Sequence, residues 1–237
     1  MLASAAPSYA QSPARVSDIN WQGWFAYNGD HALSSRWGIH FDTQARRHPF
    51  VTKWQQYYVR PGVNFQLNGL IRVGVGYMFG KSYPYGDYPA QRASHEHRIY
   101  EQLEIRHKTG NLKWGHRFRL EQRFAENGVT HKGEEQVIDW VYRNRLRYRL
   151  HLQIPLTGET WYLPLSNEIF LNFGANSPRA FNQNRAYAGI GHKLSKTASL
   201  EVGYIYQTQL QNSGRVMEHN NTIIISFSSS FPFRRSK

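Results

Sequence analysis

The chain has 237 residues, a formal net charge of +13 and no cysteine, and 15% of its residues are aromatic. This length suits one large domain, and the lack of cysteine excludes disulfides and thiolate metal sites. No apolar run approaches the ~20 residues that a membrane helix needs. The positive charge alone would suggest nucleic acid as a partner, but the basic residues stand singly at strand spacing and form no nucleic-acid motif. We therefore expect no nucleic-acid partner.

The first segment, residues 1–19, carries small residues and the stretch Ala-Pro-Ser-Tyr-Ala-Gln, which resembles the end of a signal peptide cleaved after Ala10. A basic start and an apolar stretch of 7–15 residues, the other parts of such a peptide, are missing. The alternative is a flexible leader. We predict an exported protein in which 1–19 is a signal-peptide remnant and flexible segment, and 20–237 forms the folded domain.

From Trp21 onward the chain predicts strands separated by turn signals. In chain order they are 20–27, 35–46, 52–67, 70–79, 96–107, 112–125, 137–153, 161–173, 184–194, 198–211 and 218–228. Most exceed the ~5–6 residues of a typical globular strand and reach the ~9–11 that span a membrane. Short and longer connections alternate along the chain, as they do in outer-membrane barrels, with the short connection 47–51 as an exception.

Within these strands apolar and charged side chains alternate. In "LKWGHRFRLEQRF", residues 112–124, Trp114, Phe118 and Leu120 fall on one parity and Arg117 and Glu121 on the other. Successive side chains of a strand point to opposite faces. A soluble barrel would place the charged face in water, whereas a membrane barrel places it in the lumen and turns the aromatic, apolar face to lipid.

We therefore predict an all-β fold: a single antiparallel up-and-down transmembrane β-barrel of 10–12 strands, monomeric, in the bacterial outer membrane. The sequence yields eleven strands, and single-chain bacterial barrels normally have an even number. We accordingly expect either ten, if 20–27 is not a full strand, or twelve, if one strand is unrecognised. A soluble exported β-barrel binding protein is the structural alternative.

Several short stretches also resemble a known family. They are "VRPG" at 59–62, "GVGY" at 74–77, "YEQLEI" at 100–105, "RFRLEQRF" at 117–124, "RNRLRY" at 143–148 and "NEIFLNFG" at 167–174. In this order they resemble a widespread bacterial family of unknown function regarded as outer-membrane-like β-barrels. The resemblance implies a porin-like fold and an outer-membrane location in a Gram-negative bacterium. It implies no activity and no catalytic residues.

The predicted lumen is charged. The side chains expected to project into it are Glu104, Arg106, Arg117, Arg119, Glu121, Arg123, Arg143, Arg145, Arg147, Glu168 and Arg185. Unpaired charges in a narrow space are costly, so we expect arginine–carboxylate ladders between neighbouring strands. Full pairing would make a rigid structural plug. An unneutralised excess of arginine would instead line a narrow channel that favours a small anionic solute.

Two other kinds of site are open at this stage. Ser166, His151 and Glu168 share the polar face of neighbouring strands and could serve an outer-membrane lipid hydrolase. His95 and His97, two residues apart in "HEH", could hold a metal with a third ligand. Surface histidines beside a loop are more often solvated, and we expect no cofactor.

The basic excess also fits a membrane partner. Phosphates of lipopolysaccharide lie at the outer rim, and rim cations can contact them. The cations predicted there are Lys81, Arg92, Lys132 and Arg179.

Overall fold

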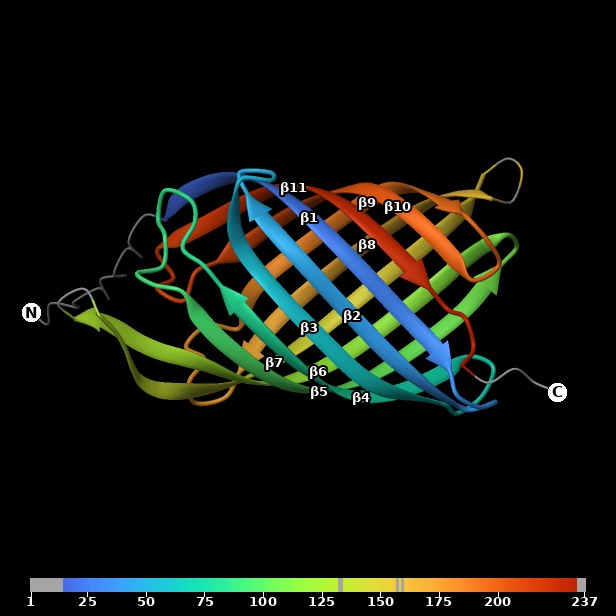
Figure 1. Cartoon of the computed structure of the whole chain (residues 1–237), viewed down its shortest axis with the longest axis horizontal. Coiled ribbons are helices and arrows are strands. Elements are labelled where there is room, and N and C mark those ends of the chain that lie inside the picture. Colours follow the sequence, from blue (N-terminus) through green and yellow to red (C-terminus); the bar gives the residue numbers. More distant parts are fainter. Residues whose placement is uncertain (1–14, 132–133, 157, 159, 234–237) are drawn as a thin grey trace, which may run out of the picture.

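The computed structural model describes residues 15–131, 134–156, 158 and 160–233, so residues 1–14 of the predicted leader 1–19 lie outside the described part. Eleven strands form in it, one for each predicted strand (Figure 1). They are β1 (Val16–Ala32), β2 (Trp37–His48), β3 (Lys53–Gln66), β4 (Ile71–Ser82), β5 (Ser94–Thr109), β6 (Leu112–His131), β7 (Glu134–Pro155), β8 (Trp161–Phe173), β9 (Phe181–Lys193), β10 (Ala198–Leu210) and β11 (Val216–Ser229). None of the described residues forms a helix long and apolar enough to span a bilayer.

The strands close into one barrel in which every strand pairs with its chain neighbours. The remaining pair, β1 with β11, is parallel, with Val16 opposite Val216 and Trp24 opposite Ile224. The expected even number of strands is therefore wrong. In an up-and-down barrel an odd number makes the first and last strands run the same way, so their closure has to be parallel.

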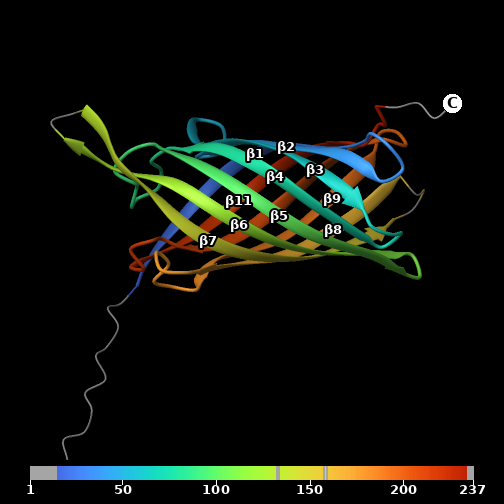
Figure 2. The same cartoon turned by 90° about the horizontal axis from the view of Figure 1, so that it is seen from below.

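Several strands are longer than their alternation predicts. β1 begins at Val16, four residues before the predicted start, because its first residues pair with β11. Pairing of β5 with β6 ends at Ala125, and pairing of β7 with β8 begins at Asn144. Beyond these points β6 and β7 pair only with each other, and their ribbon projects past the rim of the barrel (Figures 1 and 2). The loops 83–93 and 174–180 lie at the same end as this ribbon, together with the short connection 49–52, and the turns 33–36, 67–70 and 110–111 lie at the other (Figure 1).

The barrel is polar inside and apolar outside. Buried side chains include Arg119, 1% exposed, and Glu121, also 1%, whereas Phe118, directly before Arg119, is 40% exposed. Tryptophans mark both ends of the outer face: Trp21 and Trp54 toward the long loops, Trp37 and Trp161 toward the short turns. Lipid-facing side chains and interfacial aromatic rings have this distribution in membrane barrels.

Polar groups on the outer face hydrogen-bond to one another. Gln122 donates to Glu101 at 3.1 Å, and Asn167 and Asn184 exchange two hydrogen bonds at 3.0 Å. This pairing reduces the cost of placing polar groups against hydrocarbon. The chain is thus a transmembrane β-barrel, and the soluble alternative is wrong because the outward face is apolar and the charges are buried.

Candidate functional site

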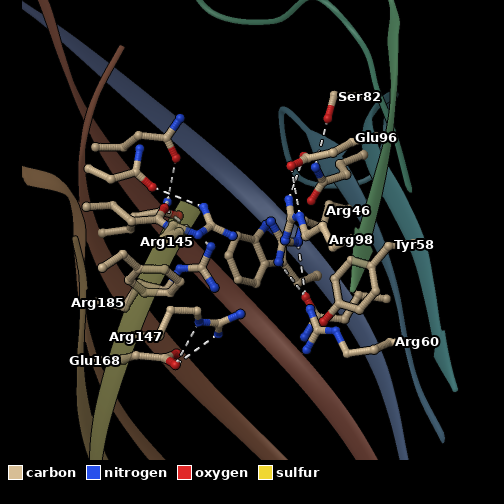
Figure 3. Close-up of a pocket in the computed structure, with 18 of the residues that line it drawn as sticks. Arg46, Tyr58, Arg60, Ser82, Glu96, Arg98, Arg145, Arg147, Glu168 and Arg185 are labelled. Atoms are coloured by element: carbon tan, nitrogen blue, oxygen red, sulfur yellow. Dashed lines mark hydrogen bonds and ion pairs between the residues drawn. The ribbon is translucent and has the colours of Figure 1, made fainter. Parts of the chain in front are cut away.

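The lumen encloses a cavity of about 800 Å³. Among the described residues twelve arginines and eight carboxylates line it, and the excess of arginine persists when Arg119, Glu121 and Asp18, buried behind this lining, are added. Figure 3 shows Arg145, Arg147 and Arg185 on one side of the cavity. Arg46, Arg60 and Arg98 lie on the other side (Figure 3).

In the first cluster of charges, two glutamates each form ion pairs with two arginines. Arg145 on β7 approaches Glu121 at 2.5 Å, and Arg147 on the same strand approaches it at 2.7 Å. Arg147 also reaches Glu168 at 2.9 Å, and Arg117 on β6 reaches the same Oε1 atom of Glu168 at 2.7 Å. Each carboxylate therefore serves two arginines, which is why so many cations can share this part of the lumen.

Similar nodes occur in the rest of the wall. Glu96 accepts from Arg98 and Arg123, at 2.7 and 2.5 Å. Glu104 accepts from Arg72 and Arg106, each at 2.6 Å. On the opposite wall Asp42 pairs with Arg60 at 2.8 Å. All the side chains predicted to project into the lumen lie on the lumen side, and Arg106, with 58% of its side chain exposed, stands at the short-turn end.

The register of β6 on β7 places like charges opposite each other. Three directly opposed pairs are arginine on arginine: Arg117 with Arg149, Arg119 with Arg147 and Arg123 with Arg143. Directly opposed like charges destabilise a sheet. Their presence shows that this wall concentrates positive charge rather than minimising it.

Four arginines that line the cavity have no carboxylate within ion-pair distance among the described residues: Arg46, Arg143, Arg149 and Arg185. Arg46 donates to the side-chain oxygen of Gln44, and Arg185 has a long contact of 3.4 Å with Gln183. Arg119 also lacks a carboxylate partner, but it is buried against Gln102 and does not reach the cavity. Arg119 therefore points toward the lumen as predicted but lies behind the residues that line the cavity.

Aromatic rings connect these arginines into what we call the arginine–aromatic belt. Its members follow one another around the lumen, with guanidinium carbons 3.8–6.0 Å from the ring centroids: Arg147, Phe170, Arg185, Trp24, Arg46, Tyr58, Arg60, Tyr100 and Arg119. Arg119 and Arg147 are opposite each other on β6 and β7, so the belt closes on itself. Cation–π contacts hold each guanidinium without neutralising it.

The four aromatic members of the belt were missed at the sequence level. Trp24, Tyr58, Tyr100 and Phe170 are all less than 4% exposed and lie on the charged face of their strands. The alternation of the strands could have placed them in the lumen, because each stands two residues from an inward polar side chain, as Tyr58 does from Arg60. Gly76 on β4 leaves the space that the Tyr100 hydroxyl occupies.

The loop between β4 and β5, residues 83–93, covers the long-loop mouth. Tyr85, Tyr88, Pro89 and Ala90 line the cavity from above, and the Tyr85 hydroxyl donates to Glu218 on β11 at 2.5 Å. Because β11 stands across the barrel from β5, the loop reaches over the opening. Burial and the Glu218 carboxylate raise the pKa of the Tyr85 hydroxyl above its usual value.

The predicted hydrolase residues do not assemble as a catalytic group. Ser166 and His151 are directly opposite on β8 and β7 and line the cavity, away from lipid. No hydrogen bond joins them in the described part of the chain. Glu168 accepts from Arg117 and Arg147 instead of orienting His151. The geometry brings these three side chains close but directs the carboxylate to arginine.

The two histidines of "HEH" lie on the outer face. His95 pairs with Glu126 at 2.9 Å, and His97 packs among Phe79 and Trp140 and hydrogen-bonds to Tyr77. No group of three or more metal-ligating side chains is found in the residues that the structure describes. His97 therefore belongs to the aromatic border of the barrel.

The four predicted rim cations differ in their surroundings. Arg92 is buried near Glu126, at 3.7 Å, and Lys81 lies near the Tyr83 ring. Arg179 is exposed and donates to the Asn212 carbonyl, whereas Lys132 lies outside the described residues. Arg179 is the most exposed of the three described cations.

Comparison with known proteins gives a family and a fold. The model of the family described as "Protein of unknown function (DUF2490)" matches residues 21–218, and the chain belongs to this family. The match confirms the predicted membership of a family of unknown function. No curated protein matches the chain.

Two solved structures are similar to it. One is the β domain of the Bordetella autotransporter BrkA, with 13% identity over 84% of this chain and 83% of that one and a TM-score of 0.49. The other is the NanC porin, with 10% identity over 85% of this chain and 94% of that one and the same score. Similarity at this level implies nothing about what the present barrel carries.

Proposed function

We propose that this DUF2490 protein is a bacterial outer-membrane barrel whose lumen forms a narrow channel selective for small anions. The observation that carries the proposal is the charge of the cavity lining, twelve arginines against eight carboxylates among the described residues. Arg46, Arg143, Arg149 and Arg185 contribute to that lining with no carboxylate partner in the described part of the chain. Fixed positive charge in a confined space attracts anions and repels cations.

Two features set the expected bore. The arginine–aromatic belt narrows the lumen from its wall, and loop 83–93 covers the long-loop mouth. We infer a small conductance and an upper size limit close to that of a small organic anion. A plug held by complete pairing is the competing function, and the unpaired arginines of the lining argue against it.

The membrane assignment within the proposal rests on the barrel's outer face. The apolar band, the tryptophans at both ends and the alternation of short turns and long loops suit the bacterial outer membrane. In that membrane the long-loop end would face lipopolysaccharide, and the exposed Arg179 is the cation placed to contact its phosphates. We further propose that the barrel works as a monomer.

Single-channel recording tests the channel. The refolded protein would be inserted into a planar bilayer under a KCl gradient, and the reversal potential would give the selectivity. We expect small, stable steps that favour chloride over potassium. Arg46→Gln and Arg185→Gln should each reduce this preference, whereas Arg36→Gln, in the exposed turn between β1 and β2, is the matched control and should leave it unchanged.

Two results would overturn the proposal. One is an inserted, folded barrel that passes no current, which would make the lumen a plug. The other is a cation-selective current, which the excess of arginine does not allow.

A further inference from the structure

A row of four charged side chains crosses the lumen wall from β6 to β9. The register places Arg117 opposite Arg149, Arg149 opposite Glu168, and Glu168 opposite Arg185. All four line the cavity. The row holds three cations and one anion, so it carries a net charge of +2.

Donors in this row lack acceptors. The Nε atoms of Arg117, Arg149 and Arg185 are buried and have no hydrogen-bond partner in the described structure. Glu168 accepts at Oε1 from the terminal Nη2 atoms of Arg117 and Arg147, and none of the three Nε atoms donates to it. Buried polar groups in native proteins are nearly always hydrogen-bonded, so three unpaired donors in one row of the lumen wall are available to an acceptor.

The same row is also electrostatically incomplete. Arg117 and Arg149 are directly opposed, and no ion pair of Arg149 is found among the described residues. Two adjacent guanidiniums without an anion between them repel each other. An oxyanion with several acceptor atoms would relieve this repulsion and satisfy the free N–H groups together, because the guanidinium fork matches carboxylate and phosphate geometry.

We propose that Arg117, Arg149 and Arg185 form a binding site for a doubly charged oxyanion inside the lumen. The charge of two on the row selects a divalent group over chloride. His151, two residues after Arg149, and Ser166, two before Glu168, line the cavity beside the row and add hydrogen-bonding groups. The inference rests on the proposed anion channel and names the solute class that the channel would hold.

Two sources share this chemistry: phosphate groups and dicarboxylates. Inorganic phosphate and succinate are the probes that separate them. Titration calorimetry on the detergent-refolded protein at pH 8 would measure the affinity for phosphate and the affinity for succinate, with chloride as the competing ion. Phosphate and succinate should both bind, and 100 mM chloride should displace neither. A protein that binds only one of the two assigns the solute to that group.

Arg149→Gln tests the site, because Arg149 is a cation in the middle of the row with no carboxylate partner among the described residues. Phosphate affinity should fall about 10- to 100-fold, as expected for the loss of charged hydrogen bonds. Arg143→Gln is the matched control, since it removes the same charge six residues earlier on β7, and it should change the affinity less than about twofold. Arg149→Lys keeps the charge but loses the planar guanidinium. Its phosphate affinity should lie between those of Arg149→Gln and Arg143→Gln. Circular dichroism and gel mobility without heating would verify that each variant folds.

The outcomes separate this inference from the proposed function. Chloride-selective current without phosphate or succinate binding would overturn the oxyanion site and leave the channel standing. Equal binding by Arg149→Gln and wild type would overturn it too. Binding that is lost in Arg149→Gln, in a barrel that passes no current, would support the site and reject the channel.

Discussion

Arg117 on β6 and Arg149 on β7 lie directly opposite each other in the antiparallel ladder, with their buried Nε atoms unpaired. An antiparallel pair of this kind normally carries opposite or neutral side chains. Two further arginine pairs repeat the arrangement on the same two strands. The β6–β7 wall is therefore a strip of positive charge, held in place by Glu121, Glu168 and Glu96 from neighbouring positions.

Glu121 is the first residue whose loss we expect to weaken the barrel. Glu121→Gln leaves Arg145 and Arg147 without their shared charged partner in a buried site. Breaking a buried ion pair from one side costs about 3–5 kcal/mol of folding free energy. Urea unfolding of the protein in lipid vesicles, followed by tryptophan fluorescence, would measure the change. Glu101→Gln, on the outer face, is the control and should stay within about 0.5 kcal/mol of wild type.

Trp24 should limit the bore of the channel. Its indole is buried in the lumen between Arg46, at 3.8 Å, and Arg185, at 5.0 Å from the ring centroid. Trp24→Ala removes this bulk and frees both guanidiniums, so single-channel conductance should rise. Trp21→Ala changes the same residue type on the lipid face of the same strand and should leave conductance unchanged. An unaltered conductance in Trp24→Ala would place the narrowest point elsewhere.

Gly86 should determine how closely loop 83–93 packs against β1. Its φ of +76° is in the left-handed region, and a Cβ there would lie 2.6 Å from Asp18 Oδ2 on β1. Gly86→Ala should therefore lift the loop and speed amide hydrogen exchange over 83–93. Gly110→Ala, with φ of +58° but nothing within 4 Å of the new Cβ, separates backbone strain from the clash and should not affect this loop.

The Tyr85 contact should make the loop sensitive to alkaline pH. The folded-state pKa of Tyr85 is raised by burial and by Glu218. The loop conformation in which Tyr85 contacts Glu218 therefore favours the neutral hydroxyl. Its stabilisation is fully present below the usual tyrosine pKa of 10.0 and is lost as the pH rises from there through the folded pKa. Hydrogen exchange of 83–93 should therefore accelerate above pH 10 relative to the β-strand core.

Tyr85→Phe removes both the hydrogen bond and the titration. Exchange of the loop should be faster than in wild type at pH 8, and the difference between the two proteins should shrink above pH 10. Tyr88→Phe is the control, because the Tyr88 contact with Gln211 runs through its backbone carbonyl. A constant difference across this pH range would show that another group latches the loop.

The sequence by itself determined which side chains face the lumen and which face lipid. Strand alternation has a period of two and is local, so Phe118 and Arg119 reveal their opposite faces without knowledge of any partner strand. The same alternation located all eleven strands and identified most of the lumen charges. The even strand number was expected from the strand counts of known barrels rather than from these residues. The barrel instead closes with eleven strands, through the parallel pairing of β1 with β11.

Only the tertiary structure decided what each inward side chain meets. Whether Arg149 opposes a glutamate or Arg117 depends on the register of β6 on β7, and a shift of two residues would change every partner while preserving the alternation. The belt joins Trp24 on β1 to Arg185 on β9, which closure of the barrel brings together. Loop 83–93 reaches Glu218 for the same reason. These relationships depend on contacts between residues far apart in the chain, which local periodicity does not encode.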